Sequence, residues 1–243
     1  LFKVVRQSFV RYEPLGVVSV ISPYNYPFSI PMSSIVFALL AGNTVVFKAA
    51  SDAVLVAKKI EEIFREGGRL PEGVLNLVTA SGSSIGTTLY EPPVAKVTFT
   101  GSTETGVSIM RDAAKHLIPV TLELGGKDPM IVLPDADLER AANGAVWGSY
   151  CNAGQTCASV ERLYVHRSIH DEFVKILKSK VESLRVGLGT DPDVDVGPLI
   201  NERQRETVEA HVADATEKGA QVVVGGRRPV ELKGYFYEPT LLT

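Results

Sequence analysis

The chain has 243 residues, of which 45% are hydrophobic and 22% charged, which is ordinary for a globular protein large enough to bury a core. A formal net charge of -3 at pH 7 argues against the basic surface that binds nucleic acid or anionic lipid. We therefore expect a small molecule as partner, and neither nucleic acid nor a membrane.

Cysteine content and hydropathy predict a soluble protein of the cytoplasm. The two cysteines, Cys151 and Cys157, are too few to crosslink a fold of this size, which indicates a reducing setting. The longest apolar stretch, Ile30 to Leu40, is shorter than the roughly 18 residues that span a membrane. The chain starts with Leu1 and has no signal-peptide pattern, so we expect its first residue to lie inside a longer protein.

The first half of the chain predicts strands that alternate with helices. Residues 3–12 are rich in β-formers and predict an edge strand or hairpin within an arm of residues 1–14. Further strands are expected at 17–21, 44–48, 74–78, 96–100 and 119–122, and helices at 31–41, 53–66 and 102–116. Short buried strands separated by helices predict an α/β fold with a Rossmann-like, doubly wound parallel sheet over residues 15–123.

The pattern restarts after Gly125-Gly126, which predicts a second α/β domain over residues 124–243. Strands are expected there at 129–133, 162–165 and 221–224, and helices at 138–150, 169–184 and 201–218. We expect the first domain to bind a cofactor, the second to be catalytic, and both to be incomplete.

Cys157 is the first candidate for chemistry. It lies in a loop of small residues that leaves the helix at 138–150, where backbone N–H groups can face a thiolate or an oxyanion. The alternative is a buried, inert cysteine, and Cys151 on the helical approach is assigned to that class.

Glu123 and Asn25 are candidate polar partners of a nucleophile. Glu123 ends an apolar strand before two glycines, and partial burial would make its carboxylate a better proton acceptor near pH 7. The alternative is a Glu123 that pairs with Lys127. Asn25 lies between two prolines and two tyrosines, so its amide suits a fixed hydrogen-bond donor for an oxyanion, although this segment taken alone favours an ordinary turn asparagine.

Gly101 and Ser102 lie where a strand turns into a helix, an arrangement that presents N–H groups to a phosphate. A simple capped helix is the alternative. Lys48 ends another strand at the same predicted edge, where its charge could meet a ribose or phosphate, unless it is a surface lysine. The histidines and cysteines lack metal-ligand spacing, so no metal is expected.

Four segments carry a resemblance: PYNYP at 23–27, FTGSTETG at 99–106, LELGGKDP at 122–129 and NAGQTCAS at 152–159. In this order and at these separations they resemble the aldehyde dehydrogenase superfamily, hydrolytic type, over essentially the whole chain. The resemblance implies that Cys157 is the nucleophile, that Glu123 is the general base, and that Asn25 with the Cys157 backbone N–H forms the oxyanion hole.

The implied reaction is oxidation of an aldehyde to a carboxylic acid, with hydride transfer to NAD(P) and a thioester on Cys157 that water hydrolyses. CoA-acylating relatives typically lack the glutamate, so Glu123 favours hydrolysis. Two alternatives stay open: a CoA-acylating dehydrogenase, and a non-catalytic remnant that binds nucleotide.

The resemblance also implies that Lys48 and Ser51 lie near the adenine ribose, and that Gly101 and Ser102 lie near the pyrophosphate. NAD-preferring relatives commonly carry a glutamate at the position of Ser51, which repels a 2′-phosphate. Ser51 predicts that NADP is accepted, with NAD as the other cofactor.

The sequence also departs from the family pattern. Tyr24 and Ala49 stand where many members carry tryptophan and proline, from which we infer nothing. The family's E-x-F-G-P segment does not occur, so we expect a catalytic-core fragment that is inactive alone. The parent enzyme is expected to form a homodimer or homotetramer through its arm strands.

Overall fold

The computed structural model describes residues 9–243, and the chain divides into two compact units between Leu124 and Gly125. The first eight residues lie outside the described part, and with them most of the strand predicted at 3–12. The described remainder of the predicted arm, residues 9–14, forms neither helix nor strand. The arm strand therefore stays a prediction.

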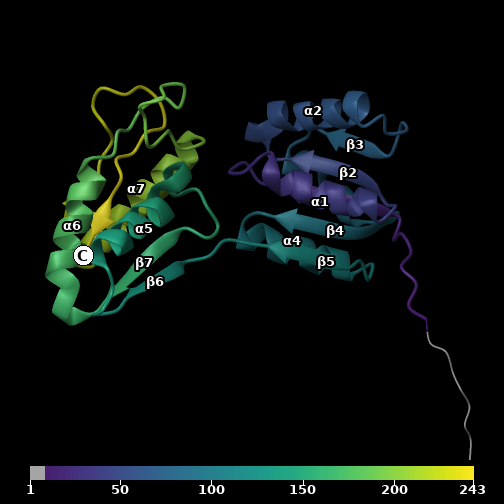
Figure 1. Cartoon of the computed structure of the whole chain (residues 1–243). Coiled ribbons are helices and arrows are strands. Elements are labelled where there is room, and N and C mark those ends of the chain that lie inside the picture. The colour runs from purple at the N-terminus through teal and green to yellow at the C-terminus, as the bar shows by residue number, and fades with distance from the viewer. Residues whose placement is uncertain (1–8) are drawn as a thin grey trace, which may run out of the picture. The chain divides into compact units, whose positions relative to one another are not determined.

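The first unit is built on a five-stranded, wholly parallel sheet in the order β3-β2-β1-β4-β5 (Figure 1). Its strands are β1 (Val17–Ser22), β2 (Thr44–Ala49), β3 (Leu75–Val78), β4 (Val94–Thr100) and β5 (Val120–Glu123). Its helices are α1 (Ser29–Leu40), α2 (Val54–Glu62), α3 (Gly82–Ile85) and α4 (Thr103–Ala114). The predicted Rossmann-like parallel sheet is confirmed. The direction in which successive strands are added reverses between β1 and β4, as in doubly wound folds.

Apolar side chains on both faces of the sheet explain why it is wound on both sides. Val20 of β1 is buried in one cluster with Ile35 of α1 and Ile60 of α2. Its neighbour Ile21, which the pleat directs to the opposite face, packs against the cluster that contains Ile109 of α4. A strand covered on both faces has the continuous apolar run that marked β1 in the sequence.

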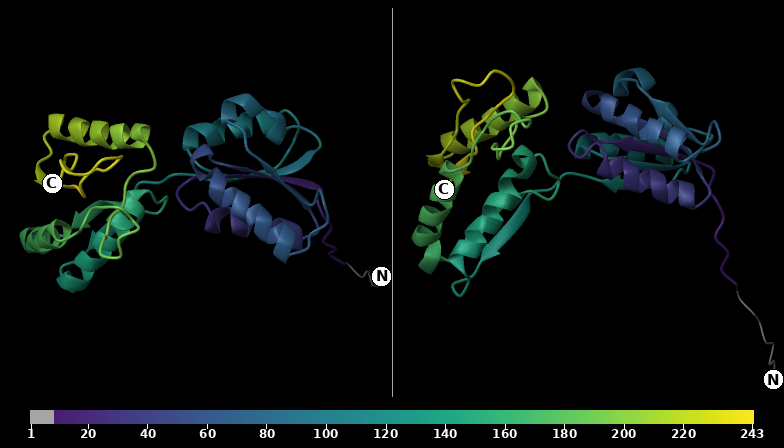
Figure 2. Two further views of the ribbon diagram at one scale, coloured as in Figure 1. Left: turned by 90° about the horizontal axis from the view of Figure 1, so that it is seen from above. Right: turned by 45° about the horizontal axis from the view of Figure 1, so that its top comes forward.

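The second unit contains two small sheets and three long helices. The parallel pair is β6 (Asp128–Val132) with β7 (Val160–Val165), and the antiparallel pair is β8 (Val222–Val224) with β9 (Leu241–Leu242). The helices are α5 (Leu138–Tyr150), α6 (His170–Glu182) and α7 (Glu202–Glu217), and two further views show α5 beside the β6–β7 pair (Figure 2).

Apolar packing and helix caps define this second unit. Phe173 and Leu177 of α6 are buried against Ala142 of α5. The Asp137 side chain caps α5 by accepting from the Arg140 N–H at 3.1 Å, and Asn201 caps α7 in the same way. In the part of the chain that the structure describes, no helix combines the length and the apolar character that a membrane crossing needs.

Candidate active site

The candidate residues of the first unit gather at the carboxyl edge of its sheet, where ligands bind in doubly wound folds. They follow or end four of the parallel strands: Asn25 after β1, Lys48 and Ser51 around the end of β2, Gly101 and Ser102 after β4, and Glu123 at the end of β5. β1 and β4 are neighbours at the reversal of strand order, so the segments of Asn25 and Gly101 flank that point.

Asn25 lies in the loop between β1 and α1 and is partly buried. Its Oδ1 accepts a hydrogen bond from the Tyr26 backbone N–H at 3.1 Å. This bond engages the acceptor end of the amide, so a bond to a substrate oxygen has to come from Nδ2, the donor end. The orientation suits the donor role predicted for Asn25.

Lys48 is buried, with 9% of its surface exposed, and is not the surface lysine that was the alternative. Its Nζ donates to the Ala49 carbonyl at 3.1 Å, and no ion pair within residues 9–243 includes it. Burial lowers the pKa of Lys48 because desolvation disfavours the ammonium form. A buried cation whose partner is a neutral carbonyl is a suitable site for an anionic ligand.

The turn after β4 contains Gly101, where only a glycine fits, and Ser102, which caps helix α4. A Cβ on Gly101 would lie 2.5 Å from Cζ of Phe99, so no larger residue fits without displacing that ring. The Ser102 hydroxyl accepts from the Thr105 N–H at 3.2 Å and caps α4. The first N–H groups of a helix have no partner within it and attract anions, so the capped helix and the phosphate site are compatible.

Ser51 opens a short 3-10 turn, η1 (Ser51–Ala53), between β2 and α2. It is exposed, and it follows Lys48 by three residues at the same edge of the sheet. A glutamate at this position would therefore add its negative charge at the surface of the edge, where a ligand can meet it.

Glu123 is the last residue of β5, and its side chain is exposed. The partial burial expected for a general base is therefore not found, because β5 is the edge strand and ends at the surface of its unit. Lys127, the residue considered as its alternative partner, forms an ion pair with Glu161 within the second unit.

Cys157 is exposed and lies in a turn between α5 and β7, whereas Cys151 is half-buried. The approach to this turn, η4 (Cys151–Gly154), contains the left-handed residues Asn152 and Ala153, with φ values of 54° and 57°. For a residue such as Ala153 this conformation costs about 1–2 kcal/mol, whereas asparagine adopts it more readily. Backbone strain of this kind persists only where surrounding contacts enforce it, and it is common at functional sites.

The Cys157 turn packs closely on the second glycine of the LELGG segment. A Cβ on Gly126 would lie 3.0 Å from the Cys157 carbonyl oxygen and 2.8 Å from Oδ1 of Asp128. On the other side, the buried Ser159 hydroxyl donates toward the last turn of α5, to Gly148 O at 3.2 Å. The absence of a side chain at Gly126 therefore allows the cysteine turn to approach its backbone closely.

Sequence reasoning missed the role of Gln155. Its Oε1 accepts from the Ile200 N–H at 2.9 Å, and its Nε2 donates to Asn152 O at 3.1 Å. A polar residue two positions before the candidate nucleophile was the only available signal, because its partner Ile200 is 45 residues away. Among the described residues, no group of three or more His, Cys, Asp or Glu side chains could hold a metal.

The first unit has a parallel sheet with candidate residues along its carboxyl edge, and the second carries a cysteine on a strained turn. These features place the chain among the Rossmann-like α/β proteins. The sequence model of the Aldehyde dehydrogenase family matches residues 3–243. The chain therefore belongs to the aldehyde dehydrogenase family, which confirms the resemblance.

Individual relatives agree with this assignment. D-glyceraldehyde dehydrogenase (NADP(+)) of Picrophilus torridus is 44% identical over 243 residues, which cover 98% of this chain and 48% of that protein. The structure of succinate-semialdehyde dehydrogenase from Burkholderia pseudomallei matches 95% of this chain and 48% of its own, with 41% identity and a TM-score of 0.92.

A third relative was solved with a bound nucleotide. Betaine aldehyde dehydrogenase from Staphylococcus aureus, in complex with NAD+, matches 95% of this chain and 46% of its own, with 38% identity and a TM-score of 0.90. The chain thus spans about half the length of the relatives it matches.

Proposed function

We propose that the protein oxidises an aldehyde to a carboxylic acid, with NADP or NAD as hydride acceptor and Cys157 as nucleophile. The first unit then acts as the cofactor domain and the second as the catalytic domain. The observation that carries the proposal is the buried Lys48, a cation without a carboxylate partner within the described residues, at the sheet edge shared with Gly101 and Ser102.

The residues at this edge fit a dinucleotide. Lys48 and Ser51 would hold the adenine ribose and any phosphate on it, and the start of α4 after Gly101 and Ser102 would face the pyrophosphate. Ser51 brings no negative charge to the ribose, which supports NADP as an accepted cofactor. The NADP(+) in the name of the Picrophilus relative and the NAD+ bound to the Staphylococcus relative support both members of the pair.

The chemistry assigned to this chain begins at Cys157. Its Sγ attacks the aldehyde carbon, and the carbonyl oxygen becomes an oxyanion that Asn25 Nδ2 and the Cys157 N–H stabilise. A nicotinamide dinucleotide held by the first unit would supply the hydride acceptor for oxidation of this adduct to a thioester. Glu123 then takes a proton from the water that attacks the thioester carbon, and cleavage of the carbon–sulfur bond releases the acid and the Cys157 thiolate.

Exposure of Glu123 is compatible with this role, since a general base has to reach water. Its presence supports hydrolysis over acyl transfer to CoA, and the preserved set of Cys157, Glu123 and Asn25 supports an enzyme over a nucleotide-binding remnant. The relatives named above act on D-glyceraldehyde, succinate semialdehyde and betaine aldehyde according to their names. We propose an aldehyde as the substrate, without specifying the group attached to it, and an oligomeric enzyme.

The test measures the absorbance of the reduced nicotinamide while the whole protein is offered aliphatic, aromatic and carboxylated aldehydes, with Cys157→Ala as control. Turnover without CoA that requires Cys157 is expected. Turnover that appears only with CoA would move the assignment to an acylating dehydrogenase. Nucleotide binding without turnover of any aldehyde would favour the remnant.

A further inference from the structure

The Gln155 side chain joins the turn of the candidate nucleophile to a distant segment of the second unit. At one end of its amide, Nε2 donates to Asn152 O at 3.1 Å, and at the other end, Oε1 accepts from the Ile200 N–H at 2.9 Å. The Gln155 backbone N–H also donates to Asn152 O at 3.1 Å. The Gln155 side chain thus binds the backbone of η4, which precedes Cys157, and links it to Ile200.

This approach needs an external constraint. Asn152, Ala153 and Gly154 take φ values of 54°, 57° and 74°, a left-handed run that only the glycine adopts without cost. Such a run relaxes unless neighbouring contacts hold it. Because Cys157 itself is exposed, its own side chain has little packing to fix the turn. The Gln155 amide provides a polar link from this run to another part of the unit.

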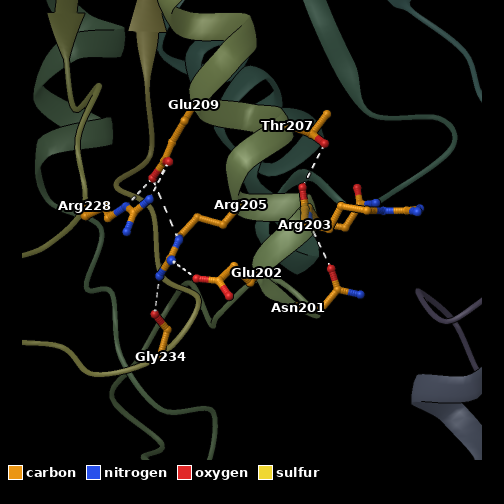
Figure 3. Close-up of polar contacts among 9 residues, drawn as sticks. Asn201, Glu202, Arg203, Arg205, Thr207, Glu209, Arg228 and Gly234 are labelled. Carbon is orange, nitrogen blue, oxygen red and sulfur yellow. Dashed lines mark hydrogen bonds and ion pairs between the residues drawn. The ribbon is translucent and has the colours of Figure 1, made fainter.

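Ile200 is in turn held from the opposite side. The N–H of its neighbour Leu199 donates to Tyr235 O at 3.0 Å, and Leu199 is buried. The next residue back along that loop, Gly234, has its carbonyl bound by Arg205 Nη1 at 2.7 Å (Figure 3). A continuous series of hydrogen bonds therefore runs from Arg205 through two short segments to the Cys157 turn.

The Arg205 side chain is buried and held in place by several partners. Only 8% of its surface is exposed, its Nη2 donates to Glu202 at 3.1 Å, and its guanidinium lies 5.8 Å from the centre of the Tyr235 ring. Glu209, which lies 3.8 Å from Arg205 Nε, is bound in turn by Arg228 (Figure 3). A buried, planar group with several partners holds its carbonyl ligand more rigidly than an exposed lysine would.

We propose that Gln155 is a positioning residue for Cys157: its amide sets the nucleophile turn against the Leu199–Ile200 segment, which Arg205 anchors through Gly234. The inference rests on the proposed function in taking Cys157 as the nucleophile. Gln155 does not touch the substrate in this proposal; it holds the backbone of the turn that carries Cys157. Loss of its two bonds lowers the reactivity of Cys157 while the cofactor edge of the first unit is unaffected.

The test is the rate at which iodoacetamide alkylates Cys157 in the whole protein, followed by peptide mass spectrometry that separates Cys157 from Cys151. Gln155→Met keeps the length of the side chain and removes both hydrogen bonds. We expect alkylation of Cys157 to slow by about tenfold or more, and kcat to fall with it, while KM for NADP stays within about twofold. Gln221→Met, an exposed glutamine of the same unit, is the matched control and retains wild-type rates.

A second variant guards against a Gln155→Met protein that does not fold. Gln155→Asn keeps the amide but is one methylene too short to reach both Asn152 and Ile200, so the same slow alkylation is expected. Wild-type or faster alkylation of Cys157 in either folded variant would overturn the proposal. Alkylation needs no aldehyde, so it tests the role of Gln155 separately from the proposed function. If the wild-type protein turns over no aldehyde, the proposed function is contradicted, but the alkylation rates of wild type and variants can still be compared.

Discussion

The backbone N–H of Gly101 donates to the carbonyl oxygen of Glu123 at 3.0 Å. This bond continues the parallel pairing of β4 and β5 by one residue beyond Thr100, and it ties the turn before α4 to the end of the edge strand. The segment proposed to face the pyrophosphate and the residue proposed as base are thus fixed to each other through their backbones. A change in the turn at Gly101 is therefore also a change at Glu123.

Gly101→Ala is expected to reduce stability. The new Cβ would lie 2.5 Å from Cζ of Phe99, a ring that is 4% exposed and cannot move freely. Overpacking of this kind costs about 1–3 kcal/mol in the free energy of unfolding, as measured by urea denaturation. Gly67→Ala, where a Cβ meets nothing within 4 Å, is the control and should be neutral or slightly stabilising. Equal stability of the two variants would contradict the steric argument.

Glu123→Gln is expected to separate oxidation from hydrolysis. The glutamine keeps the shape of the side chain and cannot take a proton from water, so the thioester on Cys157 should accumulate. A rapid burst of reduced nicotinamide is expected, followed by turnover slower by about a hundredfold or more. Stopped-flow absorbance measures both phases, with Glu66→Gln, an exposed glutamate of the same unit, as control. A steady rate equal to that of wild type would remove Glu123 from the mechanism.

Ser51→Glu is expected to shift the cofactor preference toward NAD. A carboxylate at the exposed start of η1 would repel a 2′-phosphate and could bind the ribose hydroxyls of NAD. The kcat/KM for NADP should fall by about tenfold or more, whereas that for NAD should hold or rise. Ser51→Ala removes the hydroxyl without adding charge and isolates the repulsion. If kcat/KM for NADP is the same with glutamate as with serine at this position, the charge argument fails.

Local patterns predicted most elements because their signals are local. Helix α5 spans Leu138–Tyr150, the predicted range, since Asp137 caps it and its apolar positions recur at helical spacing. The two-residue strand β9 was missed because Leu241–Leu242 carries no periodic pattern of its own. Its existence depends on pairing with β8, which lies far back in the sequence. Short strands of this kind are properties of the tertiary fold.

For the candidate site too, local sequence patterns predicted some features and not others. Motifs at strand ends predicted which residues lie at the carboxyl edge of the sheet, because parallel strands bring their carboxyl ends together. Burial was harder to predict: Lys48 is enclosed although a surface position was an alternative, and Glu123 is exposed although partial burial was expected. The link from Gln155 to Ile200 was beyond local reasoning, since it joins two loops that only the folded unit brings together.

Lys48→Met is expected to stabilise the protein and to weaken its binding of NADP. Lys48 is buried with a carbonyl as its bonded partner, so folding removes an ammonium group from water without a carboxylate to compensate. Methionine fills a similar volume without that cost, and the free energy of unfolding at about pH 7 should rise. Lys58→Met, at an exposed lysine of α2, is the control and should change stability little.

The gain from Lys48→Met should depend on pH in a defined direction. Burial lowers the pKa of Lys48 below the 10.5 of an unfolded lysine, so between these two values the unfolded chain binds more protons than the folded one. The cost of the buried charge is therefore fully present below the folded pKa and disappears as pH rises toward 10.5. The stability difference between Lys48→Met and wild type, measured by urea denaturation across this range, should shrink with rising pH. A difference that is constant with pH would mean that Lys48 is stabilised as a cation by its surroundings.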